Sequence, residues 1–232
     1  MKKMFAKSLY CIVLGGRPSS RRIIVTGSGD DQLDFDQGYQ GLTQYLVTVQ
    51  RNGDRSGHTI EVSSSRSGVT PRTNPLVNNF TLIGAGTGGH GIRLDSRAAG
   101  RYQNGVVIDT DACLDYRDTV GDGIEGFESG SDPEFWSVLF DCEDGVFSSK
   151  SDTTTGQAAI SNDVSGVRGN SFATNTLFDV FVNGTAEAAV RVTPAPRLTG
   201  EDTDYIGAVR ADDTWWQGWT CGGLGVEGSP PC

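Results

Sequence analysis

Acidic residues are concentrated in one short stretch near the N-terminus. Asp30, Asp31, Asp34 and Asp36 fall within seven residues, with glycines before and after them. Carboxylates held this close repel one another unless a cation neutralises them, and Ca²⁺ prefers carboxylate oxygens as ligands. The stretch therefore predicts a Ca²⁺ site formed by these four residues. The alternative is an Asp-rich turn whose side chains hydrogen-bond to their own backbone.

Two histidines offer a second kind of chemistry. His58 and His90 are the two histidines of the chain, and each lies two residues before an isoleucine, Ile60 or Ile92. If these isoleucines are equivalent positions of a repeat, the two imidazoles lie next to each other. Histidine beside a carboxylate can act as a general base, so we predict His58 and His90 as candidate catalytic residues. A stacked, hydrogen-bonded pair without a catalytic role is the alternative.

An irregular internal repeat indicates what would position these side chains. Five segments share an apolar strand, a turn rich in Gly and Asp, and a short alternating strand; they cover 23–35, 45–62, 81–94, 106–116 and 138–147. The residues taken as equivalent are Ile24, Val47, Leu82, Val107 and Leu139. One such unit cannot bury its apolar side alone, whereas stacked units share a core with strands ~4.8 Å apart. We therefore predict an all-β fold: a single right-handed parallel β-helix, or solenoid, of irregular coils. A β-sandwich is the alternative, because it also contains many short strands.

Aligning the short second strands predicts which side chains face outward. Two apolar sets should point inward: Leu33, Ile60, Ile92 and Leu114, and Phe35, Val62, Leu94 and Tyr116. The intervening residues should form two outward rows: Asp34, Glu61, Arg93 and Asp115, and Asp36, Ser63, Asp95 and Arg117. We predict a ligand face formed by Glu61, Arg93, Asp95, Asp115 and Arg117. A solvated face whose opposite charges offset each other is the alternative.

The ends of the chain depart from the repeat. Residues 1–22 predict either a first β-strand or a poor signal-like segment, residues 23–220 the β-helix domain, and residues 221–232 a Cys/Gly/Pro tail. The segment 175–192 predicts a strand pair with its turn at Asn183–Gly184. Three of the four tryptophans lie in 204–220, and we expect this Trp-rich segment to fold as a cap across an end of the solenoid.

Cysteine usage and charge restrict the compartment and the partners. Spacing predicts the pairs Cys113–Cys142 and Cys221–Cys232 with Cys11 unpaired, which fits an oxidising compartment; buried reduced thiols are the alternative. A net charge of −10 argues against nucleic acid as a partner. No run of about 18 apolar residues is present, so no transmembrane segment is expected.

Three segments, 25–50, 74–94 and 204–220, resemble a known family. Its members are secreted or lipid-anchored bacterial right-handed parallel β-helix proteins, largely uncharacterised and often carrying transporter-type labels. The resemblance implies the β-helix and an extracellular, cell-surface or periplasmic location, and it brings no established reaction.

Two functions from different classes follow. The first is an extracellular Ca²⁺-binding module that presents its acidic outward face to a glycan or another extracellular ligand. The alternative is a Ca²⁺-assisted hydrolase or lyase that acts on an acidic polysaccharide or a small ester or lactone, with His58, His90 or an adjacent Asp as base. A second acidic stretch, 121–134, is an alternative cation site, although its composition is more typical of an excursion loop.

Overall fold

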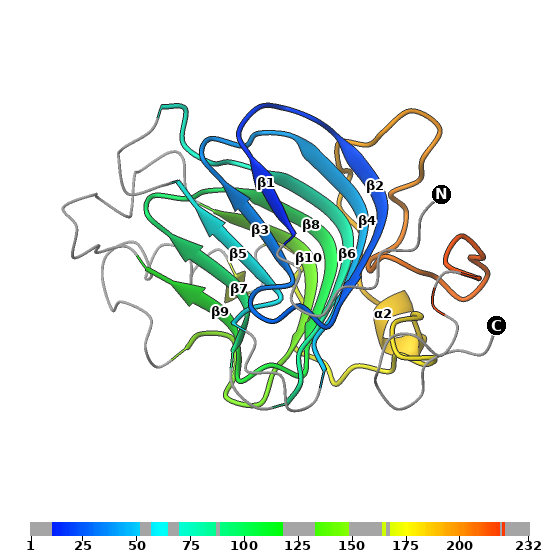
Figure 1. Ribbon diagram of the computed structural model, residues 1–232. Helices are drawn as coiled ribbons and strands as arrows, with labels where there is room; N and C mark the ends of the chain where they lie inside the picture. The colour runs from blue at the N-terminus through cyan, green and yellow to red at the C-terminus, as the bar shows by residue number, and fades with distance from the viewer. Residues whose placement is uncertain are drawn as a thin grey trace.

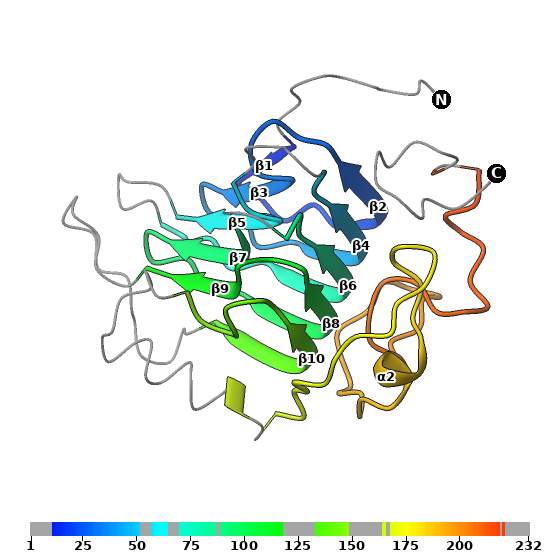
Figure 2. The same ribbon diagram turned by 90° about the horizontal axis from the view of Figure 1, so that it is seen from below.

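Within the described residues, ten strands stack in two parallel sheets (Figures 1 and 2). The structure is a computed structural model that describes residues 11–51, 57–64, 70–86, 89–117, 133–148, 164–165, 168–218 and 220. The first sheet contains, in spatial order, β1 (Ile12–Leu14), β3 (Leu33–Asp36), β5 (Ile60–Ser63), β7 (His90–Asp95) and β9 (Ala112–Tyr116). The second contains β2 (Ser20–Thr26), β4 (Leu42–Val49), β6 (Leu76–Ile83), β8 (Arg101–Ile108) and β10 (Glu134–Asp141).

Each strand pairs in parallel with the strand one coil away, so the chain is the parallel β-helix solenoid predicted from the repeat. In the first sheet the predicted register is confirmed: Leu33 pairs with Ile60, Ile60 with Ile92, and Ile92 with Leu114. A disulfide joins Cys113 to Cys142 between neighbouring coils, as the spacing predicted, and Cys11 forms no disulfide with another described cysteine. The predicted Cys221–Cys232 pair and residues 121–132 of the second acidic stretch lie outside the described residues.

Each long strand of the second sheet bends at one residue in the left-handed backbone region. These residues are aligned across the sheet and form what we term the corner row: Arg22, Tyr45, Asn79, Asn104 and Ser137, with φ between 51° and 58°. Left-handed backbone is uncommon for residues other than glycine, although asparagine adopts it more readily than most. The corner row divides every long strand into a first arm and a second arm that point in different directions, which gives the curvature seen in Figure 1.

The register of the second arms shows that two of the equivalences predicted from the repeat are wrong. Thr81 and Val106, rather than Leu82 and Val107, are in register with Val47. Leu82 and Val107 point into the core of the solenoid, whereas Val47 and Val106 belong to a separate apolar cluster on the outside. A shift of one residue exchanges the two faces of a strand, and here both faces are apolar, so the hydrophobic pattern does not fix the register.

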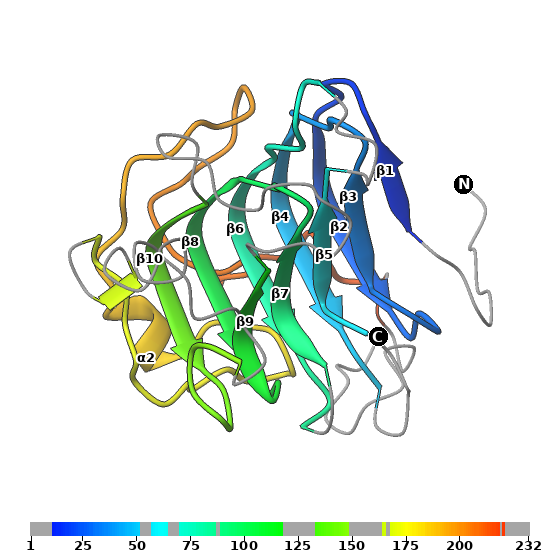
Figure 3. The ribbon, with the colours of Figure 1, turned by 90° about the vertical axis from the view of Figure 1, so that its left-hand side faces the viewer.

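Residues 191–218, which we term the C-terminal strap, cover the outside of the second sheet (Figures 2 and 3). Trp216 packs with Val47, Val106 and Leu139 in the outer apolar cluster. Hydrogen bonds also join the strap to the corner row; Asn79 Nδ2, for example, donates to the Tyr205 carbonyl at 2.7 Å. The Trp-rich segment is therefore a cap on the side of the solenoid, and its predicted place across an end was wrong. The apolar outer side of the second arms offers the tryptophans a larger surface to pack against than an end of the solenoid would.

The predicted strand pair over 175–192 is also wrong. Phe178 and Val182 form an isolated antiparallel bridge around Asp179 and Val180, both with positive φ, and Asn183–Gly184 leads into the short helix α2 (Thr185–Ala188). The Glu187 carboxylate accepts hydrogen bonds from the backbone N–H groups of Thr176 and Gly184, which stabilises the helical turn. Among the described residues no helix has the length and apolar character needed to cross a membrane.

Candidate functional site

The outward side of the first sheet carries the residues predicted to do chemistry, and we term it the open face. Asp34 pairs with Glu61, Glu61 with Arg93, and Arg93 with Asp115, so the first outward row is arranged as the sequence predicted. Asp95 is aligned with Ser63 in the second row. On β1 the rows continue as Ile12 and Leu14, which are 48% and 58% exposed.

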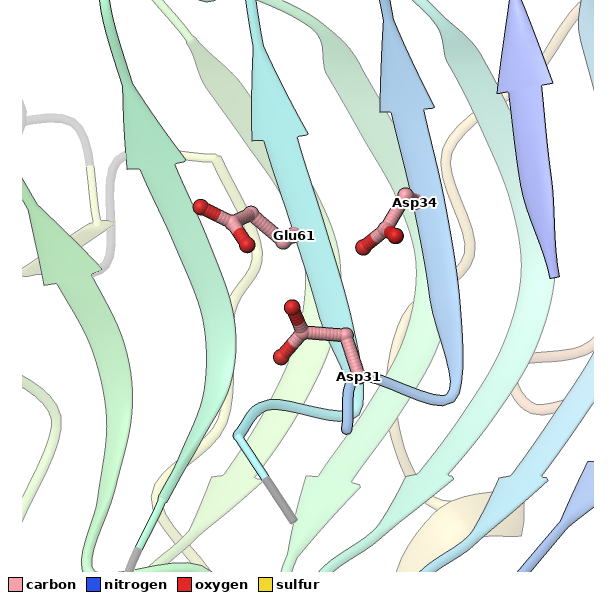
Figure 4. Close-up of side chains that lie close together, drawn as sticks. All are labelled: Asp31, Asp34 and Glu61. Atoms are coloured by element: carbon pink, nitrogen blue, oxygen red, sulfur yellow. The ribbon is translucent and has the colours of Figure 1, made fainter. Parts of the chain in front are cut away.

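Three carboxylates converge at one end of the open face (Figure 4). One oxygen each from Asp31, Asp34 and Glu61 lies within 4.8 Å of the other two. Asp31 comes from the turn before β3, and its Oδ1 accepts a hydrogen bond from the His58 backbone N–H. A Cβ atom at Gly57 would lie 2.2 Å from that oxygen, so a larger residue at this position would displace the Asp31 carboxylate.

In these three residues, which we term the acidic triad, the charged form of the carboxyl groups is destabilised. Burial, then the charges of Glu61 and Asp30, raise the pKa of Asp34 to about 6. Burial and a hydrogen bond with Asp31 raise the pKa of Glu61 to about 8. Burial also raises the pKa of Asp31. The triad therefore favours either a bound proton or a cation near neutral pH.

The donor set of the triad fits Ca²⁺. All three ligands are hard carboxylate oxygens, and in the part of the chain that the structure describes Asp34 Oδ1 is buried without a hydrogen-bond partner. The two other aspartates of the predicted metal set are placed differently. Asp30 is exposed and stands outside the triad, while Asp36 accepts a hydrogen bond from the Gln37 backbone N–H. Glu61 takes their place, although the sequence prediction assigned it only to the ligand face.

The two histidines lie one coil apart, as their spacing predicted. Their rings stack with centroids 5.1 Å apart, and the two Nδ1 atoms are 3.3 Å apart. His58 Nδ1 also accepts the backbone N–H of His90 at 3.2 Å. Burial, then the charges of His90 and Arg93, lower the pKa of His58 to about 3, so this imidazole is neutral and a weak base. His90 Nδ1 lies 3.5 Å from Asp115 Oδ2.

Arginines balance the remaining carboxylates of the open face. Arg93 contacts Asp95 at 2.9 Å and Glu61 at 3.6 Å. Arg117 Nε lies 3.0 Å from Oδ1 of Asp115, whose side chain is fully buried. The predicted ligand-face residues are thus brought together, and each of these guanidinium groups is already engaged by a carboxylate.

Comparison with known proteins adds one match. The model of a family described as "Pectate-lyase like beta helix domain" matches residues 13–220. No curated protein and no solved structure matches. The family match fits a carbohydrate-related role.

Proposed function

We propose that this chain, which belongs to the pectate-lyase-like β-helix domain family, is an extracellular module that binds an acidic glycan on its open face with the help of Ca²⁺. The observation that carries the proposal is the acidic triad: Asp31, Asp34 and Glu61 bring carboxylate oxygens within 4.8 Å of one another, and Glu61 is in register with Arg93 in the same outward row. A bound Ca²⁺ would neutralise the triad and offer open coordination positions to sugar carboxylates.

The protein's own residues determine the rest of the surface. Arg93 and Arg117 hold the carboxylates of Asp95 and Asp115 in fixed positions along the two rows. An acidic sugar that replaces one of these intramolecular partners would keep the guanidinium group paired. The disulfide between Cys113 and Cys142 supports a location outside the cytoplasm, because such bonds persist in oxidising compartments.

A Ca²⁺ titration followed by thermal unfolding tests the proposal. At about 100-fold excess over Kd we expect the melting temperature to rise by about 5 °C or more. Asp34→Asn should abolish this rise and weaken binding of polygalacturonate by at least ~10-fold. The matched control is Asp212→Asn, at an exposed aspartate of the strap, which should behave as the wild type. A Ca²⁺ response retained by Asp34→Asn would refute the triad as the site.

A Ca²⁺-assisted lyase or hydrolase is the second candidate, and one observation favours it. His90 Nδ1 lies 3.5 Å from the Asp115 carboxylate, and a histidine beside a carboxylate can act as a general base, whereas the pKa of His58 is too low for that role. Incubation with acidic polysaccharides and with small esters and lactones separates the two candidates. Product formation that requires Ca²⁺ would establish the enzyme, and saturable binding without product would establish the module.

A further inference from the structure

The first arms of the second sheet carry an outward row of polar side chains that the open face does not use. We term it the amide row; it consists of Gln44, Asn78, Gln103 and Trp136, which are in register on β4, β6, β8 and β10. Their neighbours along the strands, among them Tyr102 and Phe135, point into the core. Alternation along a strand therefore directs the amide row outward.

Several polar atoms of this row are buried and have no hydrogen-bond partner among the described residues. The Gln103 side chain is 3% exposed, and its Oε1 is unpaired. The same holds for Asn78 Oδ1 and Trp136 Nε1, on the two neighbouring coils. Buried polar groups are nearly always paired in native proteins, because an unmade hydrogen bond costs the full desolvation of the group. Two acceptors and one donor on three consecutive coils are therefore available to a partner that is external to the chain.

The strap crosses the amide row with few hydrogen-bond donors to offer it. Thr193 N donates to Asn104 Oδ1, beside Gln103, and Leu198 N donates to Gln44 Oε1. Between these two points Asn78 Nδ2 donates to the Pro196 carbonyl. Prolines at 194 and 196 have no N–H, so they cannot satisfy the acceptors below them. Both prolines are exposed, and displacement of the stretch 194–197 would uncover the row without disturbing the outer apolar cluster.

We propose that the amide row is a second carbohydrate site, which binds a neutral saccharide beneath the stretch 194–197. A sugar hydroxyl both donates and accepts, so a row of hydroxyls can pair with the Asn78 and Gln103 carbonyl oxygens and with the Trp136 indole N–H. These three groups are uncharged, and the nearby guanidinium groups of Arg101 and Arg168 both contact Glu134. The chemistry therefore favours a neutral sugar here, in contrast to the acidic glycan proposed for the open face.

Indole N–H resonances of the four tryptophans, measured by NMR during titration with maltose, cellobiose and galactobiose, test this site. Trp136→Phe identifies the Trp136 resonance. We expect one of these sugars to shift that resonance in a saturable way. No saturable shift with any of the three would overturn the proposal.

Variants then assign the binding to the row. Gln103→Leu removes the unpaired amide, so the melting temperature without sugar should rise by about 2–4 °C while sugar affinity falls at least ~10-fold. The control Gln217→Leu, at an exposed glutamine of the strap, should change neither. Asp34→Asn should leave neutral-sugar binding intact, so failure at this site and failure at the acidic triad are distinguishable. Unchanged sugar affinity in Gln103→Leu, or a crystal structure grown with the sugar that shows only an ordered water on Gln103, would also overturn the proposal.

Discussion

The open face and the outer side of the second arms belong to the same coils but are built in opposite ways. On the open face, carboxylates and guanidinium groups occupy the outward rows, and Arg93 and Arg117 are each held by an acid. On the second arms, Val47, Val106 and Leu139 face outward and are buried by the strap. One side of the solenoid can thus remain open to ligands because the other side contributes the apolar burial that a narrow core cannot supply alone.

The largest loss of stability is expected from a substitution on the side of the solenoid that the strap covers. Trp216 is 8% exposed and packs edge-to-face on Phe181 at 5.4 Å. Trp216→Ala should lower the free energy of unfolding by about 3–5 kcal/mol, measured by urea denaturation. The counterpart on the open face, Asp36→Ala, should change it by about 0.5 kcal/mol or less. Similar losses of unfolding free energy in the two variants would contradict the proposed difference between the covered side and the open face.

A smaller loss of stability is expected from a substitution beside the buried charge of the open face. Arg117→Met leaves the carboxylate of Asp115, which is fully buried, without its guanidinium partner. The loss should be about 2 kcal/mol, below the range for fully buried pairs because Arg117 is 27% exposed. Adding Asp115→Asn should recover part of the loss in the same denaturation experiment. A double variant no more stable than Arg117→Met would show that charge is not the cause.

A pH-dependent change in stability is expected at the acidic triad. Glu61 has a pKa of about 8 in the folded protein, above its ordinary value of 4.5. The folded state therefore binds a proton that the unfolded state releases, and stability falls as pH rises from about 4.5 through about 8. With EDTA present, Glu61→Gln should flatten the decline of the melting temperature over that interval. A mutant profile as steep as that of the wild type would place the titrating group elsewhere.

The sequence predicted the register of β3, β5, β7 and β9 in the first sheet, but not that of the second sheet. Alternation of Asp34, Glu61 and Arg93 with apolar neighbours identifies one face as outward, so a shift of one residue would have buried charges. Around Leu82 and Val107 both faces are apolar, and the pattern alone leaves the register open. What decides it is the strap, which lies far away in sequence.

Only part of the candidate site was predicted from the sequence, and the reason is related. Proximity along the chain suggested Asp30 and Asp36 as ligands, whereas stacking brings Glu61 from the next coil to Asp34. The register of Asp34 with Glu61 was the signal that could have identified the third member of the triad. The unpaired groups of the amide row had no such signal, because only the path of the strap shows that they are covered.

The path of the strap also has a consequence for how the molecule is completed during synthesis. In a solenoid each coil touches only its neighbours, so the first coils can assemble before the last ones are made. Here Glu201 binds Arg21 and Arg22 on the first coil, each at 2.8 Å, while Thr193 contacts Ser137 on the strand β10. The first coil thus gains Glu201 as an ionic partner only after residue 201 has left the ribosome. Formation of this ion pair joins the two ends of the stack into one cooperative unit.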